Sequence, residues 1–169
     1  MKQENLYITD CIRTFTGEYV NVFDPDPETI KIEDISHSLS MQCRFGGHLR
    51  SFYSVAQHCL NCSYIISREY LQLGALLHDA SEAYLLDIPR PIKQRLPDYK
   101  KIEDNLMVVI AKKFRFDYPL HDEIKKVDEF YLKSEWIHLV INDYPYMMNA
   151  KDIDATEQQF LRRFNELNG

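Results

Sequence analysis

The stretch Leu73–Lys93 reads LGALLHDASEAYLLDIPRPIK and places several ionisable side chains close together along the chain. An apolar run leads directly into adjacent His78 and Asp79, and Glu82 follows after two small residues. If residues 71–85 form one helix, Glu82 lies three residues after Asp79 and four after His78, so the three side chains share one face. Imidazole and carboxylate groups together suit a borderline or hard divalent ion. The stretch therefore indicates a metal site with a further carboxylate beside it.

A His-Asp dipeptide by itself is common and usually caps or solvates a helix, so other parts of the chain must support the metal interpretation. His58 lies twenty residues before His78, within an apolar stretch that we expect to be helical. Asp128 lies in a later expected helix, where Asp122 is the alternative carboxylate. The candidate metal ligands are therefore His58, His78, Asp79 and Asp128.

The order of these residues resembles the H…HD…D signature of the HD-domain metal-dependent phosphohydrolase superfamily. The segment Asp87–Lys93, DIPRPIK, is similar to the D-[IL]-P-x-P-[IVL]-K segment that follows the pair in those enzymes. Within the superfamily, the chain looks most like the short nucleotide phosphohydrolases, which include bacterial 5'-deoxynucleotidases and phage dATP triphosphohydrolases. The resemblance covers residues 32–139, which is most of the chain.

The resemblance implies an all-α fold, an HD-domain helical bundle, which binds one divalent metal ion (Mn, Co, Zn, Fe or Mg). It also implies a homo-oligomer. The metal would acidify a water molecule and offset the charge of a phosphoryl group. Glu82, and Asp87 as a second catalytic carboxylate, would orient or deprotonate that water. A second metal is not expected, because the remaining histidines do not form the pattern of binuclear members; they are His37, His48, His121 and His138.

A second segment with binding chemistry, Cys43–His48, reads CRFGGH. Paired glycines let a backbone approach a ligand closely, and Arg44 can clamp a phosphate through two donors. In the similar 5'-deoxynucleotidases an arginine followed by an aromatic residue touches substrate, and Arg44–Phe45 matches that pair, although the pattern has tryptophan second. Lys93 resembles the cation that follows the second proline in the family. We therefore expect four substrate contacts, from Arg44, Phe45, His48 and Lys93.

Three of these four contacts have a simpler alternative. Arg44 could form an ordinary ion pair, His48 could lie on a loop surface, and Lys93 could be solvated. The function also has alternatives. The first is release of phosphate from 5'-(deoxy)nucleoside monophosphates, and the second is a (d)NTP triphosphohydrolase such as a dATPase, which needs further cations. The third is a nucleotide-sensing module without catalysis.

Composition limits the partners. The chain has 169 residues and a net charge of -6, so a basic nucleic-acid surface is not expected. No apolar run approaches membrane-spanning length, and no secretory segment precedes the four cysteines, so we expect a cytoplasmic protein with reduced thiols and no membrane partner. Two of these cysteines, Cys59 and Cys62, form a C-x-x-C. We expect both in the core, with redox or zinc chemistry as the alternative.

A chain of this length predicts one domain, residues 1–169, made of a β-hairpin appendage at 1–28 and a helical core at 29–169. Alternating β-formers around Gly17 predict the hairpin. Apolar spacing predicts helices at 29–45, 52–68, 71–85, 98–114, 124–144 and 154–167. The proline-rich exit 87–91 is expected to be non-helical, and the aromatic region 136–148 is a candidate interface.

Overall fold

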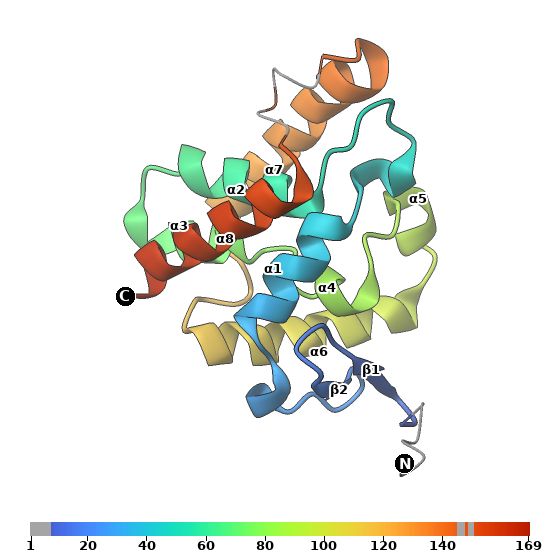
Figure 1. Cartoon of the computed structure of the whole chain (residues 1–169), viewed down its shortest axis with the longest axis vertical. Coiled ribbons are helices and arrows are strands. Elements are labelled where there is room, and N and C mark those ends of the chain that lie inside the picture. Colours follow the sequence, from blue (N-terminus) through green and yellow to red (C-terminus); the bar gives the residue numbers. More distant parts are fainter. Residues whose placement is uncertain (1–7, 145–147, 149–150) are drawn as a thin grey trace.

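A two-stranded antiparallel hairpin lies near the N-terminal end of the chain, where the alternating residues around Gly17 predict it (Figure 1). Strand β1 (Cys11–Arg13) pairs with β2 (Tyr19–Asn21) so that Ile12 lies opposite Val20. Gly17 has a φ of 93° in the connecting turn, a conformation that is cheap for glycine alone. The prediction of a small hairpin is confirmed.

The hairpin is attached to the helices by buried polar and apolar contacts. Asp34 of helix α1 (Ile32–Met41) accepts hydrogen bonds from the backbone N–H of Thr16 at 2.7 Å and from its hydroxyl at 2.8 Å. Val20 and Val22 belong to the same hydrophobic cluster as the helices. The strands and the helical part of the chain therefore share one core.

This computed structural model describes residues 8–144, 148 and 151–169. Its remaining helices are η1 (Pro27–Thr29), η2 (Arg44–Gly47), α2 (Val55–Ile65), α3 (Glu69–Leu76), α4 (Glu82–Leu85), α5 (Arg90–Lys93), α6 (Pro97–Phe114), α7 (Asp122–Glu135), the π-helix η3 (Trp136–Ile141) and α8 (Ile153–Asn168). The prediction of a mostly helical fold is confirmed. Residues 1–7 of the predicted appendage lie outside the described residues.

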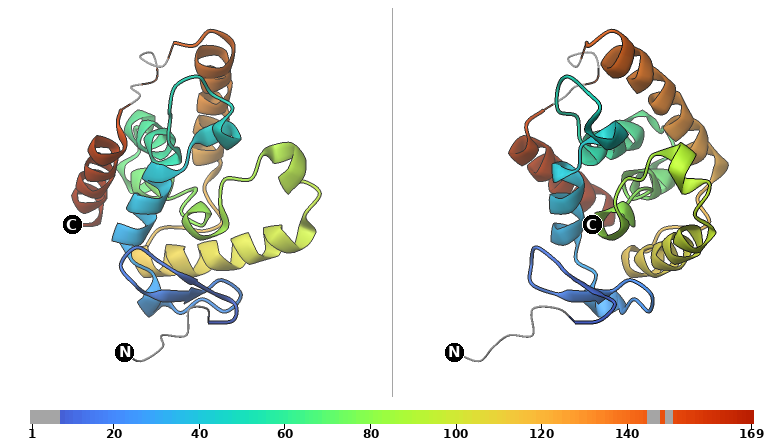
Figure 2. Two further views of the ribbon diagram at one scale, coloured as in Figure 1. Left: turned by 45° about the vertical axis from the view of Figure 1, so that its right-hand side comes forward. Right: turned by 90° about the vertical axis from the view of Figure 1, so that its right-hand side faces the viewer.

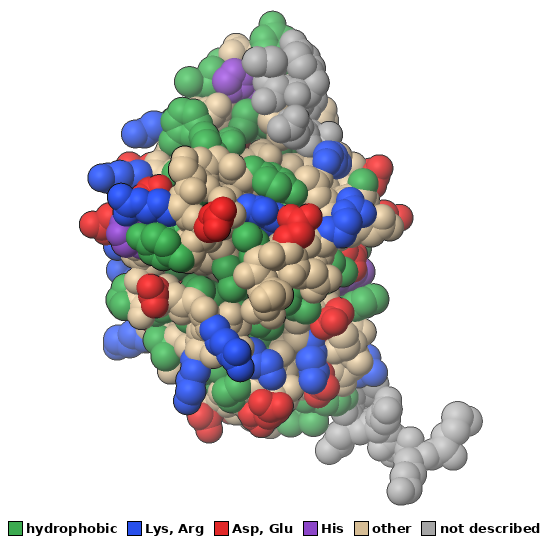
Figure 3. Space-filling model, turned by 90° about the vertical axis from the view of Figure 1, so that its left-hand side faces the viewer, with side chains coloured by type: hydrophobic (Ala, Val, Ile, Leu, Met, Phe, Trp, Pro, Cys, Tyr) green, Lys and Arg blue, Asp and Glu red, His purple; other side chains and the backbone are tan. Residues whose placement is uncertain are grey.

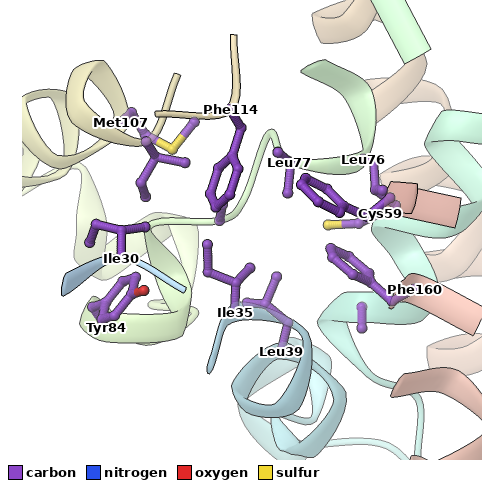
Figure 4. Close-up of a cluster of buried hydrophobic side chains, with 14 of the residues drawn as sticks. Ile30, Ile35, Leu39, Cys59, Leu76, Leu77, Tyr84, Met107, Phe114 and Phe160 are labelled. Carbon is purple, nitrogen blue, oxygen red and sulfur yellow. The ribbon is translucent and has the colours of Figure 1, made fainter. Parts of the chain in front are cut away.

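Helix α2 lies at the centre of the helical part, in contact with α1, α3, α7 and α8. Its residues 55–63 are all buried, and the Ser54 side chain caps its start by accepting from the N–H of Gln57. Figure 4 shows Cys59 of α2 among side chains from other helices, including Leu39, Leu76 and Phe160. Burying each large apolar side chain contributes about 1.5–3 kcal/mol, so this cluster holds α2 in a fixed position.

Helices α7 and η3 continue one another and extend beyond the rest of the bundle, while α6 runs along the end that carries the hairpin (Figures 1 and 2). In the described part of the candidate interface 136–148, Trp136, Ile137 and Ile141 are half exposed or more. Residues 145–147 and 149–150 lie outside the described residues. Within the described ranges, no helix combines the length and the apolar character needed to span a membrane.

The surface carries charges of both signs. On the face shown in Figure 3, lysine and arginine side chains lie among aspartate and glutamate side chains. No basic stripe dominates this face.

The predicted helix 71–85 is wrong, because α3 ends at Leu76 and α4 begins only at Glu82. The Nδ1–H of His78 donates to the carbonyl of Ala75 at 2.7 Å. In a continuous helix that carbonyl would accept from the backbone N–H of Asp79, so the side chain competes with the helical pattern. His78 and Asp79 therefore lie in a turn between two helices.

Several further boundaries differ from prediction. The helix predicted at 29–45 is α1, which ends at Met41, and the helix predicted at 124–144 is α7 followed by η3, which ends at Ile141. The segment 87–91 is not entirely irregular, because α5 begins at Arg90 with Pro91 in its first turn, where the missing N–H has no cost. Helix α8 begins before the predicted capping residue Asp154, since Asp152 is the N-cap and accepts from the N–H of Ala155 at 2.7 Å. Helix α6 matches its prediction closely.

Candidate metal centre and pocket

The four candidate metal ligands meet at one point, although they come from three parts of the chain. His58 lies on α2, His78 and Asp79 lie in the turn after α3, and Asp128 lies on α7. The Nε2 atom of His58 is 3.1 Å from Nε2 of His78 and 3.1 Å from Oδ1 of Asp128. Asp79 Oδ2 is 3.3 Å from His78 Nε2 and 3.9 Å from His58 Nε2. Asp122 is exposed at the start of α7, so it is not the competing ligand.

Glu135 is the residue of this centre that sequence reasoning missed. Its side chain is fully buried and accepts three hydrogen bonds: from His58 Nδ1 at 2.7 Å, from Arg44 Nε at 3.0 Å and from the Tyr53 hydroxyl at 3.0 Å. The available signal is its position seven residues after Asp128, two turns along the same face of α7. Burial opposes ionisation, but His58 and Arg44 hold the pKa of Glu135 below its usual value.

The backbone brings Arg44 and Tyr53 together. Cys43 and Ser54 form an antiparallel bridge, and the N–H of Arg44 donates to the carbonyl of Tyr53 at 2.9 Å. The loop between them is thereby closed at its base. Both side chains can therefore reach Glu135 from the same side.

The hydrogen bonds of the two histidine rings indicate that each ring carries its proton on Nδ1. No positive charge then lies between the acceptors of the candidate metal centre. The Nδ1 proton of His58 is donated to Glu135, and that of His78 to the Ala75 carbonyl, so in neutral rings both Nε2 atoms present lone pairs. These two acceptors and the carboxylates of Asp79 and Asp128 converge. Four converging acceptors require a cation between them, either a proton or a metal ion.

The pKa shifts of His58 and Asp128 also favour a cation at this point. Burial and the Arg44 charge lower the pKa of His58, but Glu135, Cys62 and the bond to Asp128 outweigh them and raise it well above its usual value. Burial acts to raise the pKa of Asp128, yet His58 and His78 hold it well below the usual range. A divalent ion would take the place of that proton, and the four donors fit one.

Two cysteines of α2 border the same point. Cys62 Sγ is 3.7 Å from Nε2 of His58, and the donor atoms of His58, Cys62 and His78 lie within 4.8 Å of one another. The donor atoms of Cys59, His78 and Asp79 form a second such group. Both cysteines are buried, as predicted, and burial raises the pKa of each thiol. Each of these groups could hold a metal ion.

A cavity of about 930 Å³ opens beside the centre. All the predicted catalytic and substrate-contacting residues line it together with Asp79 and Asp128; they are Arg44, Phe45, His48, Glu82, Asp87 and Lys93. Arg90, Lys133 and Trp136 line it as well and were not among the predicted site residues. Asp79, Glu82 and Asp87 thus share one cavity, although no single helical face carries them.

Carboxylates pair with both of the predicted phosphate-binding cations. Arg44 contacts Glu135 at 3.0 Å and Asp79 at 3.6 Å, and these charges raise its pKa although burial opposes them. Lys93 contacts Glu82 at 3.4 Å and also pairs with Glu103. Arg44 therefore forms an ion pair, as the simpler alternative expected, and it also lines the cavity.

The two carboxylates predicted to be catalytic are hard to ionise. Glu82 is 5% exposed, and its Oε2 atom has no hydrogen-bond partner among the described residues. Burial, followed by the charges of Asp79 and Asp87, raises the pKa of Glu82 well above its usual value. Burial likewise raises the pKa of Asp87. Glu82 is therefore a buried carboxyl group beside the cavity, with one oxygen that bonds to none of the described residues.

An aromatic pair forms one wall of the cavity. Phe45, in η2, lies edge-on to Trp136 of η3 with ring centroids 5.9 Å apart. The backbone of Phe45, Gly46 and Gly47 has φ values of 56°, 61° and 77°. Positive φ has little cost at the two glycines, and this turn carries the Phe45 ring to the cavity.

Sequence comparisons relate the chain to bacterial proteins without an assigned activity. No protein-family model matches the chain. The chain is 38% identical over 169 residues to the uncharacterized protein YfdR of Escherichia coli, covering 92% of this chain and 94% of that protein. It is 33% identical over 123 residues to an uncharacterized protein of Rhodobacter capsulatus, covering 68% of this chain and 63% of that protein. The chain therefore belongs to the YfdR family.

Proposed function

We propose that this protein is a metal-dependent phosphohydrolase with the HD-domain architecture, which releases phosphate from 5'-(deoxy)nucleoside monophosphates. One observation carries the proposal: the histidines and aspartates of the H…HD…D order converge on a point that needs a cation, at the wall of a cavity. The remaining cavity residues support phosphate and base binding.

One divalent metal ion would be held by His58, His78, Asp79 and Asp128. When bound, it supplies a Lewis acid that acidifies water and offsets phosphoryl charge. Glu135 and the Ala75 carbonyl fix the two rings so that each presents Nε2 to that position. Orientation of the ligands is thus built into the fold before the ion binds.

Glu82 is the group that takes the proton from the attacking water. Burial raises its pKa, so it holds a proton more readily than an exposed glutamate does, which favours proton transfer from the water. Asp87 lines the same cavity and assists by orienting the water. Lys93 keeps Glu82 in place through its 3.4 Å contact.

Substrate binding uses the cations and the aromatic wall. Arg44, held by Glu135, presents its guanidinium at the cavity, where it stabilises charge on the phosphoryl oxygens. Phe45 and Trp136 offer ring faces and edges to a nucleobase, and His48 lies beside them on the cavity wall. The volume of about 930 Å³ accommodates a nucleotide.

A (d)NTP triphosphohydrolase, such as a dATPase, is the second candidate. The favouring observation is that Arg90 and Lys133 line the cavity in addition to Arg44 and Lys93. A triphosphate carries more charge than a monophosphate and needs such further cations. A nucleotide sensor without turnover is a third candidate, which binding without product would favour.

The test is product analysis with chelator-stripped protein to which Mn²⁺, Co²⁺, Zn²⁺ or Mg²⁺ is added. A panel of dNMPs, NMPs and dNTPs is incubated, phosphate is measured, and nucleosides are separated by chromatography. Orthophosphate and nucleoside from monophosphates support the proposal. Consumption of triphosphates with monophosphates spared moves the assignment to the second candidate, and no turnover with any metal refutes hydrolysis of these nucleotides.

A further inference from the structure

We propose that the thiol sulfur of Cys62 is a ligand of the metal ion held by His58 and His78, and that it makes the site prefer Zn²⁺, Co²⁺ or Fe²⁺ over Mg²⁺ and Mn²⁺. The inference rests on the proposed metal dependence. It adds a donor that lies outside the H…HD…D order, and it narrows the choice of ion.

The first argument is the position of the sulfur. Cys62 follows His58 by four residues on α2, so both side chains lie on one face. The Sγ atom is 3.7 Å from His58 Nε2, and both lie within 4.8 Å of the donor atom of His78. Cys62 and His58 are each 0% exposed. The thiol and the His58 ring are therefore both enclosed by the protein.

The second argument is the match to coordination distances. Zn–N bonds of about 2.0 Å and Zn–S bonds of about 2.3 Å place the two donors of a tetrahedral ion about 3.5 Å apart. The separation between Cys62 Sγ and His58 Nε2 is 3.7 Å. Two imidazole nitrogens on such an ion lie about 3.3 Å apart, and the two Nε2 atoms here are 3.1 Å apart. Two of the three donor pairs therefore lie close to coordination spacing, and the third pair, Cys62 Sγ and the donor atom of His78, lies within 4.8 Å.

The third argument is the contrast with Cys59. Cys59 belongs to the main hydrophobic cluster, where its side chain lies near Leu76 and Phe160 (Figure 4). Cys62 is not part of that cluster, and its sulfur contacts a histidine nitrogen instead. Although Cys59 also approaches His78 and Asp79, its packing is explained by the core. The simpler alternative for Cys62 is an S–H group that donates to His58 Nε2.

Ligand chemistry gives the metal preference. Thiolate is a soft donor that favours zinc, iron and cobalt, whereas magnesium and manganese prefer oxygen. On coordination the S–H bond is replaced by a sulfur–metal bond, and the proton is released to water. A site with two imidazoles, one thiolate and the carboxylates is therefore unsuited to Mg²⁺.

The test uses Co²⁺ as the probe, added to the chelator-stripped full chain. A sulfur-to-cobalt charge-transfer band in the near ultraviolet reports the thiolate bond directly, without any turnover. We expect the wild-type band to saturate at one Co²⁺ per chain, to persist in Cys59→Ser and to be absent in Cys62→Ser. Cys11 and Cys43 are kept in every variant, so they give the same background.

Two further measurements extend the test. In competition titrations, Cys62→Ser should lower the preference for Zn²⁺ over Mn²⁺ at least about tenfold, which is the size of effect expected for a change at a metal ligand shell. Cys62→Ala is made in parallel, and thermal melts of both variants check that the fold is intact. A band that persists in Cys62→Ser, or that disappears in Cys59→Ser, overturns the assignment.

The two proposals fail in different ways. In one outcome, the wild-type protein binds one Co²⁺ and hydrolyses a nucleotide without showing a charge-transfer band. That result refutes the thiol ligand and leaves the enzyme proposal intact. A band that depends on Cys62, without hydrolysis of any nucleotide, supports the thiol ligand and refutes the proposed activity.

Discussion

The buried candidate metal centre beside the cavity, called the inner end below, is built differently from the exposed part of the cavity wall, called the outer end. At the inner end, His58 and Glu135 are fully buried, and each has a fixed partner within 3.1 Å. At the outer end, Trp136 is 51% exposed and Arg90 is exposed. The inner end is rigid because buried polar groups must be paired, whereas the outer end is free to adapt to a bound molecule. The comparison indicates that the proposed ion position is preorganised and that a substrate of the proposed reaction would be bound by weaker, adjustable contacts.

Removing an inner-end ligand should have the largest effect. His78→Ala deletes one of the converging nitrogens, so metal-dependent hydrolysis should fall by about a thousandfold or more. The measurement is phosphate release at saturating metal, together with metal content after dialysis. His121→Asn is the matched control, because it removes an exposed imidazole but keeps an acceptor at the N-cap of α7. Retained activity in His78→Ala contradicts the metal assignment.

The substitution Glu82→Gln should lower catalytic activity but raise the stability of the folded state. Loss of the base should lower kcat by about 10²–10⁴-fold, measured by phosphate release. The folded state should become more stable at pH 8, since the buried carboxylate no longer has to ionise. Each kcal/mol gained should raise Tm by about 2–4 °C.

The pH dependence of that gain has a definite sign. The pKa of Glu82 is raised in the folded state, so its protonated form contributes stability that is present below the unfolded pKa and is lost as pH rises through the folded pKa. The advantage of Glu82→Gln in melts of metal-free protein should therefore shrink toward acidic pH. Glu129→Gln, at an exposed position, should show no such trend. An equal gain at every pH would count against a buried, hard-to-ionise carboxyl.

Substitutions of the residues that hold His58 in place should have an intermediate effect on metal affinity. Glu135→Gln keeps the size of the side chain but removes the charge that orients His58, so metal affinity should fall about 10–100-fold by calorimetric titration. Tyr53→Phe removes one neutral donor to Glu135 and should cost about 1 kcal/mol of stability, with little change in affinity. Unchanged affinity in Glu135→Gln would mean that the ring of His58 needs no such support.

Changes at the outer end should be smallest. Lys133→Ala should raise KM a few-fold with kcat unchanged, because an exposed cation contributes about 1 kcal/mol or less. The effect should weaken as salt is raised, since exposed charges are screened. A loss of kcat comparable to that of Glu82→Gln would show that the outer end takes part in the reaction.

Local patterns in the sequence predict much of the fold. The glycine-centred hairpin, helix α6 and the apolar helix around His58 follow from short-range spacing, and the structure contains each of them. The break after Leu76 does not follow from such spacing, because it depends on a side-chain bond from His78 to a backbone carbonyl. Residue types in order thus predict helices better than they predict where helices end.

By itself, the sequence determined the residue types of the candidate centre: two histidines and two aspartates, which suit a divalent ion because of their donor chemistry. Only the tertiary structure decided that Glu135 holds His58 through Nδ1, that Cys62 contacts Nε2 of the same ring, and that Arg44 is bound to a carboxylate. These contacts join residues far apart in the chain or depend on which way a helix faces. Their energies arise from burial and charge pairing, which no local pattern of residues specifies.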